Sequence, residues 1–199
     1  MSMVAQVPQP KGHSQGDYIM NEHLEPVFEV LLPELEGAEI EYWVYGGVSI
    51  AACVGRFIRK NEDVDIFVKD TDFESTRSIL HDLCSRKNFT LELKTRPRPK
   101  LEVIDKREIL SVVPVYLKDG VVQFRFKNGP AEYPYEILER VVRNVSGYSL
   151  FTPPDEYIRK LFATYLSFRP DVRNRKKTRI DAKEILTPDE FAHLYPQCE

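Results

Sequence analysis

The chain has 199 residues, of which 42% are hydrophobic and 30% are charged, so it is long and apolar enough for one folded core and is not disordered by default. The formal net charge of -3 excludes a general attraction to nucleic acid or to anionic membranes. The odd count of three cysteines argues against a disulfide framework and no apolar run is long enough to span a membrane, which together predict a cytoplasmic protein without membrane contact.

The first part of the chain predicts a leader, a helix, a strand and a second helix. Residues 1–16 mix Pro, Gln, Gly and Ser without periodicity, and we interpret them as a flexible leader. From Asn21 a helical spacing of apolar residues predicts a packing helix that stops at Gly37. Residues 40–45 are rich in β-branched and aromatic side chains, which predicts a strand ending at Gly46-Gly47, and residues 48–54 follow as a short helix.

The middle of the chain predicts a mixed sheet. Residues 63–69, DVDIFVK, indicate a strand with one polar end; a helix over 73–87 and strands over 89–94 and 101–105 follow. The segment Arg96-Pro-Arg-Pro-Lys100 joins the last two strands, and we interpret it as an exposed connector rather than a basic lip over a site. Residues 111–117 and 121–126 flank Asp119-Gly120, which predicts a hairpin of antiparallel strands.

Beyond Pro134 the pattern becomes mainly helical. We expect helices over residues 135–142, 154–168 and 178–186, with an extended segment over 148–151. The whole sequence therefore predicts an α+β fold: a mixed α/β arrangement in which helices flank a mixed sheet, with a helical C-terminal portion. The expected organisation is a leader over 1–16, a core over 17–130, and a mainly helical region over 131–199 packed on that core.

Two aspartates and two glycines are the first candidate functional residues. Side chains alternate across a strand, so Asp63 and Asp65 are expected on the same face, where their carboxylates can share divalent cations of the Mg²⁺ or Mn²⁺ type. Gly46 and Gly47 allow close backbone approach, and the amides that open the following helix are suited to phosphate. Ser49 is expected to add a hydroxyl donor there.

The segment YWVYGGVSIAACVGRFIRKNEDVDIFVK, residues 42–69, resembles the nucleotidyltransferase superfamily related to DNA polymerase beta, with Gly46, Gly47, Asp63 and Asp65 at the motif positions. Within that superfamily, GRFIRKNEDVDIFV is most similar to the lincosamide and aminoglycoside nucleotidyltransferases and to the nucleotidyltransferases of toxin–antitoxin modules. The resemblance is specific over residues 42–69, weaker over 89–105 and only architectural beyond. It implies the fold of the superfamily and an ATP-binding or other nucleotide-binding site with metal-binding carboxylates.

The resemblance also implies a third acidic residue on a later strand. Glu102, in the run Leu-Glu-Val-Ile, fits the apolar-acidic-apolar pattern, and Asp105 is its rival; the two face opposite sides of a strand, so only one can face the metal. The family usually has Asp at this position, so Glu102 is a departure. We expect Asp63, Asp65 and Glu102 to be the catalytic and metal-binding residues.

Basic residues supply the remaining expectations. Lys160 lies on a helix that resembles the family helix whose lysine reaches the triphosphate, and Arg59 is expected to be a charge partner of the leaving group. The run Arg169–Arg179 has six basic residues in eleven. We interpret it as a solvated loop and helix start, with binding of triphosphate or RNA as the alternative.

The function implied by the resemblance is Mg²⁺-dependent transfer of a nucleoside monophosphate from a nucleoside triphosphate to a hydroxyl, with release of pyrophosphate. The acceptor stays open between a small molecule such as an antibiotic, which would make this a resistance enzyme, a tRNA and a protein. The alternative is a catalytically weak nucleotide-binding or partner-binding module of a toxin–antitoxin pair, and Glu102 in place of Asp motivates it. Nothing in the sequence determines the oligomeric state.

Overall fold

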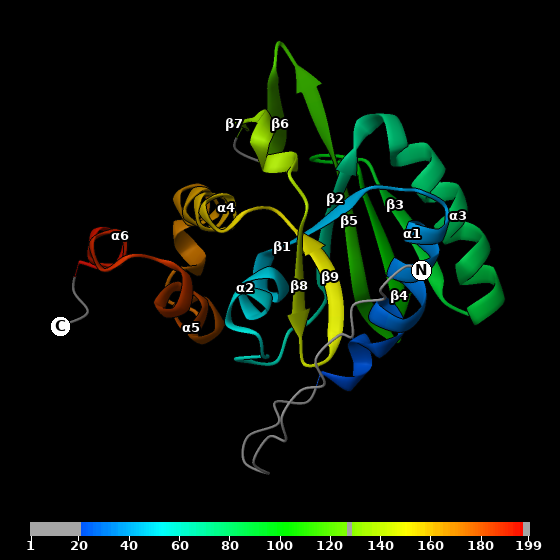
Figure 1. The fold of residues 1–199 in the computed structure, drawn as a ribbon, viewed down its shortest axis with the longest axis horizontal. Coiled ribbons are helices and arrows are strands. Elements are labelled where there is room, and N and C mark those ends of the chain that lie inside the picture. Colours follow the sequence, from blue (N-terminus) through cyan, green and yellow to red (C-terminus); the bar gives the residue numbers. More distant parts are fainter. Residues whose placement is uncertain (1–20, 127–128, 197–199) are drawn as a thin grey trace, which may run out of the picture.

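The computed structural model describes residues 21–126 and 129–196, and these form two sheets surrounded by helices (Figure 1). The expected leader, residues 1–16, lies outside the described residues. The strands are β1 (Tyr42–Tyr45), β2 (Val64–Lys69), β3 (Thr90–Lys94), β4 (Lys100–Asp105), β5 (Arg107–Lys118), β6 (Val121–Phe126), β7 (Gly129–Pro134), β8 (Val141–Val145) and β9 (Tyr148–Thr152). The α-helices are α1 (Leu32–Gly37), α2 (Gly46–Val54), α3 (Phe73–Lys87), α4 (Asp155–Phe168), α5 (Lys176–Ile185) and α6 (Pro188–Leu194).

The long strand β5 organises the larger sheet. Its first part lies between β2, to which it is parallel, and β4, to which it is antiparallel, so the strands run in the order β1-β2-β5-β4-β3. Its last residues pair with β6, which in turn pairs with β7. The sheet is therefore mixed, which confirms the predicted fold class.

Alternation along β2 explains how the sheet separates core from site. Val64, Ile66 and Val68 are fully buried in the largest apolar cluster, which includes side chains of α1 and α3. Phe67 faces the other side, where it stacks on Trp43 in a second cluster. Asp65, two residues before Phe67, lies on this second side by the same alternation.

The predicted hairpin and the predicted helices are largely confirmed. The helix expected over residues 73–87 is α3, and Asp119 and Gly120 turn β5 into β6 with positive φ at both residues, as a two-residue hairpin requires. The helical start at Asn21 consists of short 3₁₀ and π segments, Glu22–Leu24 and Val27–Leu31, before α1 ends at Gly37.

The prediction of a helix over residues 135–142 is wrong. Only Tyr135–Leu138 forms a 3₁₀ turn, and β8 then pairs with β9 across the two-residue turn Ser146-Gly147, where φ is positive at both positions. The Ser-Gly turn between two β-branched segments was the signal for this hairpin. The region over 131–199 therefore contributes strands as well as helices.

The C-terminal helices pack on α2. A third apolar cluster joins Ile50 of α2 to side chains of α4, α5 and α6, while β8 packs on α2 and β9 on β1. Figure 1 shows α4, α5 and α6 gathered beyond α2, on the side away from α1 and α3. Within residues 21–126 and 129–196, no helix has the length and apolar character to cross a membrane.

Candidate active site

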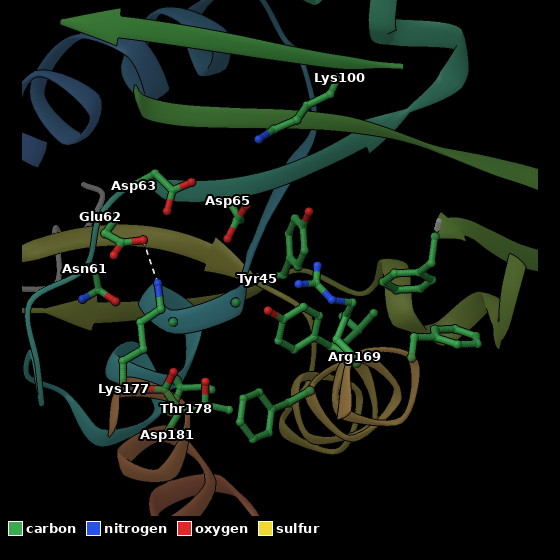
Figure 2. Close-up of a pocket in the computed structure, with 18 of the residues that line it drawn as sticks. Tyr45, Asn61, Glu62, Asp63, Asp65, Lys100, Arg169, Lys177, Thr178 and Asp181 are labelled. Carbon is green, nitrogen blue, oxygen red and sulfur yellow. Dashed lines mark hydrogen bonds and ion pairs between the residues drawn. The ribbon is translucent and has the colours of Figure 1, made fainter. Parts of the chain in front are cut away.

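A cavity of about 620 Å³ lies between the sheet and the C-terminal helices. Its walls are the corner between β1 and α2, the start of β2, the connection between β3 and β4, and the inner faces of α4 and α5. Figure 2 shows Asp63 and Asp65 on one wall, with Lys100 beyond them and Lys177, Thr178 and Asp181 opposite. Segments that are far apart in the sequence therefore build one site.

Asp63 and Asp65 both line this cavity, as their spacing predicts. Burial raises the pKa of Asp63 to about 8, with the neighbouring charge of Asp65 adding to the effect. Burial also raises the pKa of Asp65, against the opposing charge of Lys100. Neither carboxylate forms an ion pair with a residue of the described part of the chain. Two crowded carboxylates without a cationic partner are the donor set that a divalent cation fits.

The glycine corner, Gly46-Gly47, lies against Asp65. Gly46 adopts a positive φ of 71°, and a Cβ there would lie 2.7 Å from Oδ2 of Asp65. A Cβ on Gly47 would lie 2.1 Å from Nη2 of Arg59 and 2.6 Å from Oδ1 of Asn61. Only glycine fits both positions, and the amides that open α2 lie next to the carboxylates. This corner and the aspartates therefore form one site, suited to a phosphate and a cation together.

Asn61 and Arg59 support the corner from the loop before β2. Oδ1 of Asn61 is buried and accepts no hydrogen bond from a described residue, while the guanidinium of Arg59 donates to both carboxylate oxygens of Asp181, at 2.7 and 2.6 Å. The side chains of this pair are 13% and 6% exposed. Arg59 thus lines the cavity, but Asp181 of α5 already neutralises its charge. Because Arg59 contacts Gly47 and bonds to Asp181, it links the glycine corner to α5.

Two predicted phosphate-binding residues lie elsewhere. Ser49 is fully buried inside α2, is not among the cavity-lining residues, and its hydroxyl donates to the carbonyl of Gly46 at 2.8 Å. Lys160 lies on the outer face of α4, where it pairs with Glu156 at 3.7 Å and lies over the ring of Tyr157. Neither residue is placed to contact a ligand in the cavity. The helical repeat of α4 turns Ile158, Leu161 and Phe162 inward instead.

Glu102, the expected third carboxylate, faces the cavity but lies two strands away from Asp65. Glu102 faces the cavity, whereas Asp105, at the end of β4, is not one of its lining residues, so of the two alternatives Glu102 is the one that faces the site. Strand β5 nevertheless separates it from the aspartates, because Ser111 is the register partner of both Asp65 and Glu102. Two strand spacings place the Cα atoms of Glu102 and Asp65 about 10 Å apart.

Glu102 is also occupied by other partners. Its oxygens lie 2.5 Å from Nζ of Lys94 and 2.9 Å from Nζ of Lys100. Burial works to raise the pKa of Glu102, but hydrogen bonds from these two lysines outweigh it and hold the pKa below its ordinary value. The residue next to Asp65 on β5 is Ser111, which is fully buried. Over the described ranges, no three His, Cys, Asp or Glu side chains converge as metal ligands.

The interpretation of Arg96-Pro-Arg-Pro-Lys100 as an exposed connector rather than a basic lip is wrong. Arg96, Arg98 and Lys100 line the cavity, so the segment between β3 and β4 is a basic lip over the site, and the sequence analysis did not single out Lys177. Lys177 reaches across the opening to Glu62 at 2.6 Å, as Figure 2 shows. The alternation of prolines and basic residues hinted at the lip, but the pairing of α5 with the loop before β2 had no local signal.

The run Arg169–Arg179 is not a uniform basic face. Arg169 pairs with Asp171 at 2.8 Å, Arg173 donates to the carbonyl of Leu166, and Lys177 pairs with Glu62. These internal contacts neutralise or occupy much of the run, and they confirm neither RNA nor triphosphate binding.

Comparison with known proteins gives a family for this arrangement. The family model described as aminoglycoside-2''-adenylyltransferase matches residues 27–147, more than half of the chain. None of the curated proteins compared matches the sequence.

Two solved structures have the same fold. ANT(2'')-Ia in complex with adenylyl-2''-tobramycin is 16% identical with a TM-score of 0.59, and the match covers 88% of this chain and 95% of that chain. The lincosamide antibiotic adenylyltransferase LnuA, bound to lincomycin, is 17% identical with a TM-score of 0.58, over 85% of this chain and 98% of that chain.

Proposed function

Since this chain belongs to the aminoglycoside-2''-adenylyltransferase family and is a nucleotidyltransferase, we propose that it transfers the adenylyl group of ATP to a hydroxyl of a small antibiotic-like molecule. The observation that carries the proposal is the pair Asp63 and Asp65, which lines a cavity without an ion pair to any described residue and has Asp65 against Gly46 of the glycine corner. That combination is what metal-assisted transfer from a nucleoside triphosphate requires.

In the proposed site, Asp63 and Asp65 would hold Mg²⁺ or Mn²⁺, and the amides after Gly46 and Gly47 would receive the phosphates. A divalent cation there would neutralise phosphate charge and lower the pKa of the attacking hydroxyl. The acceptor oxygen bonds to the α-phosphorus, the bond to the pyrophosphate oxygen breaks, and the hydroxyl proton passes to water. Glu102 is not in the proposed metal set, because two lysines occupy its oxygens.

Nearby basic side chains are suited to the leaving pyrophosphate. Lys100 lowers the pKa of Asp63 and Asp65 through its charge, so it lies close enough for its field to reach a phosphate beside them. Lys177 lies on the opposite wall, at the rim of the opening. The cavity volume suits a nucleotide with a small acceptor better than a tRNA or a protein.

The test compares Asp63→Asn with Asp105→Asn. Each variant removes one carboxylate charge, but only Asp63 lines the cavity. With α-labelled ATP, Mg²⁺ and a panel of hydroxyl-bearing antibiotics, we expect Asp63→Asn to lose at least about a hundredfold in rate. We expect Asp105→Asn to keep the wild-type rate. Unchanged transfer by Asp63→Asn would refute the site.

One observation favours a second candidate function, a nucleotide-binding module with little turnover. The strand next to Asp65 offers Ser111 rather than a carboxylate, and among the described residues no third acidic side chain joins Asp63 and Asp65 as a metal ligand. Calorimetry with ATP in the presence of Mg²⁺ or EDTA distinguishes the two functions. If ATP binds only with Mg²⁺ and product then forms, the protein is the enzyme. If ATP binds equally with Mg²⁺ and with EDTA and no product forms, the protein is the binding module.

A further inference from the structure

The lining of the cavity restricts the class of acceptor. We propose that the acceptor is a neutral or anionic hydroxyl compound with an apolar ring surface, and not a polycationic aminoglycoside. This inference rests on the proposed function, because it concerns the second substrate of the same site. Three features of the cavity support it: its carboxylates are already paired or assigned to the metal, its lip has unpaired basic side chains, and one of its walls is aromatic.

No lining carboxylate is left for an ammonium group. An aminoglycoside carries several positive charges, and a site for it has to supply carboxylates that are not otherwise paired. Asp63 and Asp65 are assigned to the metal, and each remaining acidic side chain of the wall already has a basic partner. These pairs are Glu62 with Lys177 (2.6 Å), Glu102 with Lys94 (2.5 Å) and with Lys100 (2.9 Å), and Asp181 with Arg59 (2.6 Å).

The two buried carboxylates cannot be released cheaply. Glu102 is 6% exposed and Asp181 is 4% exposed. If an ammonium group took Asp181, Arg59 would lose its partner inside the protein; at Glu102 it would have to displace Lys94 or Lys100, which already lie 2.5 and 2.9 Å from the carboxylate oxygens. The exposed pair of Glu62 and Lys177 exchanges partners more easily, but one carboxylate does not balance several ammonium groups.

Basic side chains are in surplus on the lip. Arg96 and Arg98 line the cavity, and neither forms an ion pair with a residue in the described ranges. The guanidinium of Arg98 donates to the carbonyl of Arg125 and lies 5.5 Å from the ring centroid of Phe126, and its charge acts on Asp65 without forming an ion pair. These charges repel a polycation, and they attract a carboxylate or tolerate a neutral molecule.

The wall from α4 and β6 is aromatic. Phe126 and Phe168 pack with ring centroids 5.2 Å apart, and Phe162 and Tyr165 line the cavity beside them. Tyr165 is 37% exposed, which leaves part of its ring available to a ligand. The wall has four rings, so it offers room for the adenine of ATP and for an apolar ring of the acceptor. An acceptor that buries an apolar ring there gains affinity that a polyhydroxylated polycation does not.

The experiment titrates two probes into the full chain in the presence of Mg²⁺ and a non-hydrolysable ATP analogue. Tobramycin represents the polycations, and chloramphenicol represents neutral aromatic alcohols. We expect chloramphenicol to bind at least tenfold more tightly. Equal or tighter binding of tobramycin, or no binding of chloramphenicol at 1 mM, roughly the weak limit of specific recognition, overturns the proposal.

Two pairs of variants sharpen the result. The double variant Arg96→Glu with Arg98→Glu should improve tobramycin binding at least tenfold, whereas Arg77→Glu with Arg86→Glu on α3 changes the net charge equally but lies outside the cavity. Equal gains from both would show a general field effect and overturn the local argument.

The second pair tests the aromatic wall. Tyr165→Ser should weaken chloramphenicol binding at least fivefold, whereas Tyr135→Ser, also an exposed tyrosine but not a lining residue, should leave it unchanged. Equal binding by the two variants overturns the role of the wall. Binding of the ATP analogue is measured first in the same cell: its failure contradicts the proposed function, while the comparison of the two probes still decides the acceptor class.

Discussion

Asp63 and Asp65 repel each other in a place where burial already disfavours their charges. Burial and the charge of Asp65 raise the pKa of Asp63 to about 8, whereas in the unfolded chain it keeps the ordinary value of an aspartate. The folded protein therefore holds a proton there that the unfolded chain releases. Stability then falls as the pH rises from the unfolded pKa towards about 8, and the loss is complete above that pH.

The first prediction concerns Asp63→Asn without metal. Removing one of two crowded charges should raise the free energy of unfolding, by about 1 kcal/mol or more above pH 8, and the gain should shrink as the pH falls towards 5. Urea unfolding at pH 6 and pH 8.5 with EDTA measures it. Asp105→Asn is the control and should show no such pH-dependent gain. A destabilised Asp63→Asn at pH 8.5 would contradict the argument.

Mg²⁺ should reverse the order of stability. The cation should bind the folded wild type through both aspartates and raise its melting temperature. The Asp63→Asn variant offers the cation one carboxylate ligand fewer and should bind it more weakly. The wild type should therefore gain more from added Mg²⁺ at pH 8.5 than the variant does. An equal gain in both would show that the cation binds elsewhere.

At the scale of elements, the site depends on how closely α2 follows β1. The helix begins at Gly46, directly after Tyr45, so that its first turn lies against the aspartates and against Arg59. The strand–Gly-Gly–helix order and the spacing to the DVD segment are local signals, which is why this part of the site could be predicted from the sequence. The same holds for α3 and for the hairpin at Asp119-Gly120, whose patterns lie within each element.

The second prediction concerns Gly47→Ala. The new methyl would meet Arg59 and Asn61 at distances that require both side chains to move, which breaks the support of the corner. We expect at least a tenfold loss of adenylyl transfer, together with about 1–3 kcal/mol of lost stability. Gly37→Ala is the matched control, because nothing lies within 4 Å of its Cβ, and it should have nearly wild-type activity. Full activity in Gly47→Ala would mean that the corner does not position the phosphates.

At the scale of the whole molecule, the site is closed by contacts between distant parts of the chain. Arg59 and Asp181 are separated by 122 residues in the sequence, yet their pair joins the loop before β2 to α5. The sequence contains no local mark of such a pairing. The partners of Glu102, the place of Ser111 opposite Asp65 and the outward position of Lys160 likewise depend on strand register and helix packing, which only the folded chain defines.

The third prediction concerns this long-range pair. Asp181→Ala leaves the charge of Arg59 buried without its partner and should lower the free energy of unfolding by about 3 kcal/mol. Glu184→Ala, on the exposed side of the same helix, should change it by less than about 0.5 kcal/mol. The double variant Arg59→Met with Asp181→Leu should recover most of the loss. Urea unfolding of the four proteins measures the coupling, and a similar effect of the two alanine substitutions would contradict it.

The walls of the cavity come from two parts of the chain, and the family model matches only the first of them. The glycine corner, the aspartates and the basic lip lie within residues 27–147, the stretch that the family model matches, whereas the inner faces of α4 and α5 lie beyond it. In the proposed function, the residues that act on the phosphates therefore lie in the first segment, whereas the acceptor would contact side chains of both. Exchanging the segment after residue 150 between family members should therefore alter which acceptor is modified, while the aspartates and the glycine corner that act on the phosphates stay the same.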